Sequence, residues 1–180
     1  MTGDSQVVMR KGTVVTVFGS SRPAAGTEAY ETARRLGELL ARAGFTVATG
    51  GYGVTMEAVS RGAREAGGHV IGVTIKGWGP ANQWVEVDVA MKSWHKRLLD
   101  LVRRGAGYVV LPGGTGTLVE LAVVWEWINK GFLQEKPVVI LGEFWEPVVS
   151  AIPASEVRAK SIVRATTPEE AVDLLVSKLP

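Results

Sequence analysis

The chain has 180 residues, of which 46% are hydrophobic, and its formal net charge is +2. This length and composition suit a single domain with one core, and a small charge without a long basic run gives no reason to expect nucleic acid as a partner. With no cysteine and two histidines, His69 and His95, disulfides and thiolate nucleophiles are excluded, and we expect neither a metal site nor a cofactor.

In chain order, residues 1–12 come first and lack the apolar stretch of a signal peptide. No apolar run elsewhere is long enough to span a bilayer, so we expect a cytoplasmic protein without a membrane partner. Residues 1–12 are predicted to form a flexible tail, followed by a single domain over residues 13–180.

From residue 13 onward, short apolar β-branched runs alternate with segments of helical periodicity. The predicted strands span 13–18, 45–48, 69–74, 108–111, 138–141 and 161–164, with a weakly alternating edge strand at 84–89. The predicted helices span 27–43, 54–66, 91–104, the segment after the turn at 112–117, 144–152 and 168–179. This alternation predicts an α/β fold: a Rossmann-like, doubly wound, mostly parallel sheet with helices on both faces.

Three predicted strands are followed by turns that contain glycine: GSSR from Gly19, TGGYG from Thr49 and PGGTGT from Pro112. In an open parallel sheet such turns gather at the carboxyl edge, and glycine lets backbone N–H groups approach an anion at the start of the next helix. The tight geometry of a strand-to-helix turn explains any one of them equally well, whereas three together favour a bound phosphate. The candidate phosphate- and nucleotide-binding residues are Gly19, Ser20, Gly50, Gly51, Gly113, Gly114, Thr115, Gly116 and Thr117.

The helix after the third turn is apolar on two sides. Its stripes are Leu118, Leu121, Ala122, Trp125 and Ile128 toward the sheet, and Val123, Val124 and Trp127 roughly opposite. A helix that is apolar all round is buried all round. We therefore predict a homodimer, or a higher homo-oligomer, built partly on this helix; the alternative is that the C-terminal segment covers the second stripe.

Glu120 lies within the second stripe of that helix, where a charged side chain among apolar ones is unexpected unless it has a structural or functional role. One structural reason is a capping box, because Thr117 and Glu120 have the T-x-x-E spacing of a helix start. The other reason is a role in a binding site, for which a countercharge is needed nearby.

The preceding helix supplies a candidate countercharge. Its apolar stripe is Met91, Trp94, Leu98, Leu101 and Val102. Arg97 lies at the margin of this stripe, from which it can bury its stem and present its guanidinium to a cleft. His95 falls inside the stripe and is interpreted as a core residue rather than as an acid or base.

These residues carry a family resemblance. PGGTGTLVE at 112–120 resembles PGGxGTxxE, the signature of the Lonely Guy family, whose members were formerly labelled lysine decarboxylases. WHKRLLDLVRRGAGYVVLPGG resembles the family's MHxRK segment, with Arg97 at the spacing of the family arginine. TGGYGVTMEAVSRGA is similar to GGGxxGLMxAVxxGA, and GSSR matches the first loop of the family.

The resemblance implies a Rossmann-like homodimer that hydrolyses the N-glycosidic bond of a nucleoside 5′-monophosphate. Such a substrate, a cytokinin riboside monophosphate or AMP, would give a free base and ribose 5-phosphate. Glu120 would stabilise the oxocarbenium-like ribose and position water, and Arg97 would keep that carboxylate ionised and contact the substrate. Backbone groups of residues 113–117 would hold the 5′-phosphate.

The sequence departs from the family pattern at three positions. Trp94 replaces the family methionine and is assigned to the base pocket, Leu98 replaces a lysine, and Val119 replaces the first acid of a glutamate pair. A second function therefore stays open, that of a non-catalytic nucleotide- or molybdenum-cofactor carrier with the same fold. A lysine decarboxylase is rejected because no lysine has the setting of a pyridoxal Schiff base, and a redox dinucleotide enzyme is disfavoured because GSSR lacks the three-glycine fingerprint.

Overall fold

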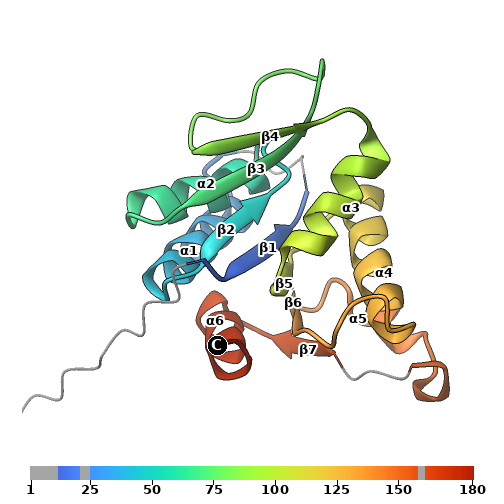
Figure 1. Ribbon diagram of the computed structural model, residues 1–180. Helices are drawn as coiled ribbons and strands as arrows, with labels where there is room; N and C mark the ends of the chain where they lie inside the picture. Colours follow the sequence, from blue (N-terminus) through green and yellow to red (C-terminus); the bar gives the residue numbers. More distant parts are fainter. Residues whose placement is uncertain (1–11, 21–24, 158–160) are drawn as a thin grey trace, which may run out of the picture.

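The computed structural model describes residues 12–20, 25–157 and 161–180. The predicted tail lies, except for Gly12, outside the described residues, as do Ser21 and Arg22 of the first glycine turn. Within the described residues seven strands form one parallel sheet, and helices cover both of its faces (Figure 1). The predicted fold class, a doubly wound Rossmann-like α/β fold, is confirmed.

The strand order places β1 near the centre of the sheet. The strands are β1 (Val14–Phe18), β2 (Thr46–Thr49), β3 (Val70–Ile75), β4 (Val87–Met91), β5 (Gly107–Val110), β6 (Val138–Leu141) and β7 (Ile162–Ala165). Their order across the sheet is β4-β3-β2-β1-β5-β6-β7. The chain builds outward from β1 to β4 and then returns to the other side of β1, so the order reverses between β1 and β5. Ligand clefts in such sheets open at this point, beyond the carboxyl ends of the strands.

The helices divide between the two faces of the sheet (Figure 1). They are α1 (Glu28–Arg42), α2 (Thr55–Glu65), α3 (Trp94–Arg104), α4 (Thr115–Asn129), α5 (Glu146–Ser150) and α6 (Pro168–Lys178), with a short 3₁₀ helix at Ala154–Glu156. α1, α2 and α6 pack on one face, and α3, α4 and α5 on the other. Side chains of a strand alternate between the faces. In β1, Val15 and Val17 belong to the core under α1 and α2, whereas Phe18 belongs to the core under α3 and α4.

Two predicted boundaries are wrong near the sheet edge. The edge strand β4 runs Val87–Met91 rather than 84–89, and α3 therefore begins at Trp94 rather than at Met91. Met91 pairs in parallel with Ile75, and its carbonyl accepts the N–H of Lys76 at 2.8 Å. An apolar residue between a strand and a helix fits both patterns, so periodicity cannot place the boundary there.

The predicted stripes of α4 are right for Leu121 and Ile128 and wrong for other residues. The residues buried toward the sheet are Thr117, Leu121, Val124 and Ile128. Val124 thus belongs to the sheet face, whereas Leu118 and Ala122 are exposed. A helix with apolar side chains all round has no polar face to fix its rotation, so helical arithmetic alone cannot choose the buried side. The C-terminal helix α6 does not provide the alternative cover for the second stripe, because it packs beside α1 on the opposite face of the sheet.

None of the helices formed by the described residues is long and apolar enough to cross a membrane. The cytoplasmic location stays a prediction.

Candidate functional site

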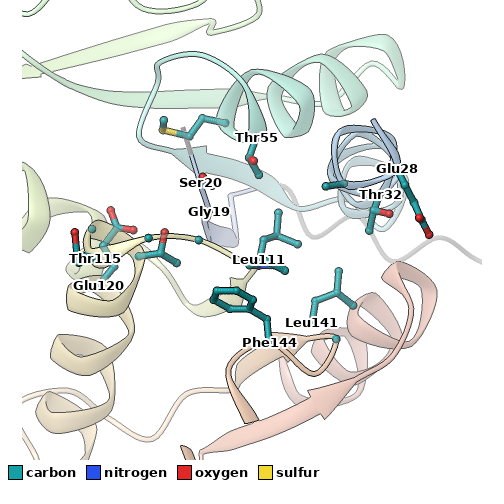
Figure 2. A pocket seen from close by; sticks show the side chains of 18 of the residues that line it. Gly19, Ser20, Glu28, Thr32, Thr55, Leu111, Thr115, Glu120, Leu141 and Phe144 are labelled. Atoms are coloured by element: carbon teal, nitrogen blue, oxygen red, sulfur yellow. The ribbon is translucent and has the colours of Figure 1, made fainter. Parts of the chain in front are cut away.

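A cavity of about 1060 Å³ opens at the carboxyl edge of the sheet, where the strand order reverses. Figure 2 shows Gly19 and Ser20 at the end of β1, between α4, which carries Glu120, and α1, which carries Thr32. The predicted site residues that line the cavity are Gly19, Ser20, Trp94, Arg97, Gly113, Gly114, Thr115, Gly116, Thr117 and Glu120. Gly50 and Gly51 are buried and are not among its lining residues.

The start of α4 presents bare backbone to this cavity. Gly114 is the N-cap residue, and no side chain of the described residues caps the helix. Within the helix, bonding starts with the N–H of Leu118, which donates to the carbonyl of Gly114 at 3.0 Å, so the earlier N–H groups have no helical acceptor. A Cβ atom at Gly114 or Gly116 would meet only open space. Free N–H groups at the positive end of a helix macrodipole form an anion site.

The capping-box interpretation of Glu120 is wrong. Because α4 begins at Thr115, Glu120 is its sixth residue and lies beyond the third helical position that a capping box requires. Its side chain is 13% exposed and its carboxylate oxygen Oε1 lies 3.9 Å from Nη1 of Arg97. The carboxylate therefore lies inside the cavity, beside the start of α4, with a guanidinium as its neighbour.

Two backbone carbonyls and an aromatic ring fix the position of Arg97. Its Nε donates to the carbonyl of Val73 in β3 at 2.7 Å, and its Nη2 donates to the carbonyl of Gly50 at 3.0 Å. The guanidinium carbon lies 5.6 Å from the centre of the Tyr52 ring, within the range of a cation–π interaction. The Tyr52 hydroxyl in turn accepts the N–H of Ile75 at 2.8 Å. With two sides of its fork occupied, Arg97 directs Nη1 toward Glu120.

Burial dominates the electrostatics of this pair. Burial raises the pKa of Glu120 from 4.5 to about 7, even though the charge of Arg97 opposes the rise. Burial also lowers the pKa of Arg97, while the charge of Glu120 and the Tyr52 side chain oppose that change. A carboxyl whose pKa lies near neutrality is typical of an acid–base group in a reaction site rather than of a structural ion pair.

The raised pKa of Glu120 predicts a pH-dependent cost in stability. Between its unfolded pKa of 4.5 and its folded pKa of about 7, the folded state binds more protons than the unfolded state, so the free energy of unfolding falls as pH rises through this window. Glu120→Gln removes this cost and should stabilise the protein by about 1 to 3 kcal/mol above pH 7, with no gain below the unfolded pKa.

Urea denaturation at acidic and at mildly alkaline pH would measure the gain. The matched control is Glu126→Gln, because Glu126 lies on the same helix and is 55% exposed. A gain in stability of equal size at both pH values, or in both variants, would contradict a raised pKa of Glu120.

Comparison with known families matches residues 12–172 to the SLOG cluster4 family. The chain belongs to this family. It is 33% identical over 155 residues to a probable cytokinin riboside 5′-monophosphate phosphoribohydrolase of Oryza sativa subsp. japonica, a match that covers 79% of this chain and 63% of the rice protein. It is 30% identical over 145 residues to a cytokinin riboside 5′-monophosphate phosphoribohydrolase of Rhodococcoides fascians, covering 77% of this chain and 73% of that protein. The resemblance to the Lonely Guy family is confirmed.

Solved structures share the fold of this SLOG protein. The molybdenum cofactor binding protein from Rippkaea orientalis has a TM-score of 0.77 and 27% identity, covering 94% of this chain and 98% of that chain. The molybdenum cofactor carrier protein from Chlamydomonas reinhardtii has a TM-score of 0.75 at 23% identity, with 94% and 98% covered, and supports the fold alone.

The second glycine turn of the SLOG protein, at Gly50 and Gly51, binds the side chain of Arg97 and does not line the cavity. A Cβ atom at Gly50 would overlap Nη2 of Arg97. Gly51 has a φ of +76°, and its carbonyl accepts the backbone N–H of Asn82 at 2.8 Å. The tight turn and the close approach of a guanidinium therefore explain these two glycines, while Gly114 and Gly116 are the ones that leave space for a ligand.

Sequence reasoning missed several cavity residues. They are Glu28, Ala29, Thr32, Thr55, Met56, Trp78, Leu111, Pro112, Leu141, Gly142, Phe144 and Thr166. The usable signal was the aromatic side chains that follow strands, because Trp78 comes after β3 and Phe144 after β6, and they are 65% and 55% exposed. A large aromatic residue just beyond the carboxyl end of a parallel strand is a candidate for the ligand site.

The interpretation of His95 as a core residue is wrong. The side chain is exposed, and its Nε2 lies 3.3 Å from the Ser93 hydroxyl at the start of α3. The helical stripe that suggested burial included Met91, which belongs to β4. Among the described residues no three His, Cys, Asp or Glu side chains gather as metal ligands would, and the expectation of no metal stays a prediction.

Proposed function

We propose that the protein is a phosphoribohydrolase that cleaves the N-glycosidic bond of a nucleoside 5′-monophosphate, of the cytokinin riboside or AMP kind, to a free base and ribose 5-phosphate. The observation that carries the proposal is the buried Glu120 carboxyl, 3.9 Å from Arg97 and beside the open N-terminus of α4. The activity named for the relatives in rice and in Rhodococcoides fascians supports it.

The proposed mechanism needs a negative charge at the sugar. As the bond between C1′ and the base nitrogen breaks, positive charge develops on the ribose, and an ionised Glu120 lowers the energy of that state. Water adds to C1′, and its proton leaves through the carboxylate while the base departs with the bonding electrons and takes up a proton. Arg97 opposes the effect of burial on the pKa of Glu120, which keeps a fraction of the carboxyl ionised at neutral pH.

The proposed phosphate site is the turn that precedes α4. Gly113, Gly114 and Gly116 keep the backbone bare, and the Thr115 and Thr117 hydroxyls stand beside the same cavity. A phosphate bound there takes up the free N–H groups and gains from the helix macrodipole. The sugar attached to it would then lie within reach of Glu120, which follows Thr117 by less than one helical turn. Gly19 and Ser20 of the first turn line the same cavity at the end of β1.

A hydrolysis screen tests the proposal. The purified protein should release adenine and ribose 5-phosphate from AMP in a chromatographic assay, and should leave adenosine intact because adenosine lacks the phosphate that the α4 cradle binds. The same assay with other nucleoside 5′-monophosphates would show which bases the protein releases. Binding of monophosphates without release of any base would contradict hydrolysis.

That outcome would favour the second candidate, a non-catalytic carrier of a nucleotide or of the molybdenum cofactor. One observation favours it: the likeness to the molybdenum cofactor binding protein from Rippkaea orientalis, which covers nearly all of both chains. Two departures from the family pattern also favour a carrier. Leu98 is a buried residue of α3 and Val119 is apolar, so neither offers a charged group to the cavity.

We further propose that the protein forms a homodimer through a groove beside α4. The groove has a volume of about 380 Å³ and is lined by apolar side chains from α4 and from the segment that contains α5. They are Leu118, Leu121, Ala122, Trp125, Val148, Ile152 and Val157. Leu118 and Ile152 are 36% and 45% exposed, and a second copy of the same groove would cover this surface.

Light scattering at micromolar concentration should give twice the chain mass of 19.2 kDa. Leu118→Asp should shift the mass to that of the monomer, because it places a charge in an apolar interface. Val176→Asp is the matched control, since Val176 on α6 is equally exposed at 36%. A monomeric mass for the unmodified protein would refute the dimer.

A further inference from the structure

Two tryptophans follow neighbouring strands of the sheet at matching positions. Ile75 and Met91 are paired across β3 and β4, and the N–H of Lys76 donates to the Met91 carbonyl at 2.8 Å. Trp78 comes three residues after Ile75, and Trp94 comes three residues after Met91. Because paired parallel strands end at the same edge, both tryptophans follow the carboxyl edge of the sheet on neighbouring strands. Both line the large cavity.

These indoles are unusually open for their size. Trp78 is 65% exposed and Trp94 is 45% exposed, and both side chains face the open space of the cavity that they line. The segment that carries Trp78 is anchored, because the Asn82 side chain donates to the carbonyl of Tyr52 at 2.8 Å. Exposed aromatic groups on an anchored segment within a cavity are typical of ligand contacts.

The reacting groups lie on the same side of the cavity as the two tryptophans. Arg97 donates to the Val73 carbonyl of β3. It lies three residues after Trp94 on α3, so the two side chains are neighbours on the helix surface. Glu120 faces Arg97. A nucleotide with its phosphate at the start of α4 and its sugar at Glu120 therefore directs its base toward β3 and β4. Besides Trp78 and Trp94, the described residues that line the cavity include one further aromatic side chain, that of Phe144.

We propose that Trp78 and Trp94 form a stacking clamp for the base and that Trp78 is a specificity-determining residue of the site. The proposal rests on the proposed function for the position of the sugar. Every base presents a π face to an indole, and a two-ring purine covers more of two indoles than a one-ring pyrimidine does.

Calorimetric binding of AMP, UMP and ribose 5-phosphate to the full chain tests the clamp. Trp78→Ala should weaken AMP binding by about 5- to 150-fold, the range for loss of one base–aromatic stack, and should leave ribose 5-phosphate binding within about twofold. Trp78→Phe should restore most of the loss, and the preference for AMP over UMP should shrink in Trp78→Ala. Phe132→Ala is the matched control, because Phe132 is 74% exposed, lies beside Trp127 and does not line the cavity.

The affinity for ribose 5-phosphate also reports whether each variant is folded. Equal losses for AMP and ribose 5-phosphate, or no loss for either, would overturn the clamp while leaving the proposed hydrolysis untouched. Conversely, AMP binding that depends on Trp78 without release of adenine supports the clamp and refutes the hydrolase. If the unmodified protein binds none of the three compounds, both proposals fall.

Discussion

Glu120→Gln is expected to lower kcat for base release from AMP by at least about a hundredfold, while AMP binding changes little. The glutamine keeps the size and hydrogen-bonding shape of the side chain and removes only its charge. Loss of one preorganised electrostatic group at the charge that develops in a transition state costs about 10²- to 10³-fold in kcat. Single-turnover assays with calorimetry on the same samples would separate the chemical step from binding.

The pH profile of the unmodified enzyme adds a second test of Glu120. Since the ionised form is the active one, kcat should rise with pH through about 7, the pKa that burial gives this carboxyl, and then level off. Glu126→Gln should keep both the rate and the profile, because Glu126 is 55% exposed and pairs with Lys130. A Glu120→Gln enzyme that retains full activity, or a rate that falls as pH rises through 7, would exclude the carboxylate mechanism.

The elements that sequence reasoning located well are those with a local signal. The strands β1, β5 and β6 are short, mostly apolar runs, and such runs are typical of parallel strands buried on both faces. α1 carries both of its boundaries in the sequence, because the Thr27 side chain accepts the N–H of Tyr30 at its start and Gly44, with a φ of +85°, follows its end.

The errors arose where one residue type satisfies two structures. Met91 fits a strand as well as a helix, and its pairing with β3 places it in a strand. Because α4 is apolar on every side, its packing on the sheet decides which side is buried. Arg97 and Glu120 were chosen from separate helices, and their approach to 3.9 Å depends on how α3 and α4 cross the same face of the sheet. Their roles stay predictions, as does that of Trp94. The relation of Trp78 to Trp94 could not be predicted, because the pairing of β3 with β4 has no local signature.

Gly50→Ala is expected to lower kcat/KM by about a hundredfold, although the residue itself does not line the cavity. The new methyl group would occupy the place of Nη2 of Arg97 and would come within 2.5 Å of the Met56 sulfur. The guanidinium must then leave the Gly50 carbonyl that holds it at 3.0 Å, and it no longer points Nη1 at Glu120. With its countercharge displaced, the pKa of Glu120 should rise further, so the activity profile should move to higher pH.

Gly53→Ala is the matched control for this change, since it lies in the same turn and a Cβ atom there would meet nothing within 4 Å. Its rate and pH profile should stay unchanged. Thermal unfolding of both variants separates loss of the fold from displacement of the arginine, and only displacement moves the pH profile of a folded enzyme. An unshifted profile with full activity in Gly50→Ala would mean that the frame around Arg97 has no part in the reaction. The glycines of this turn would then serve the fold alone, and the start of α4 would carry the chemistry without them.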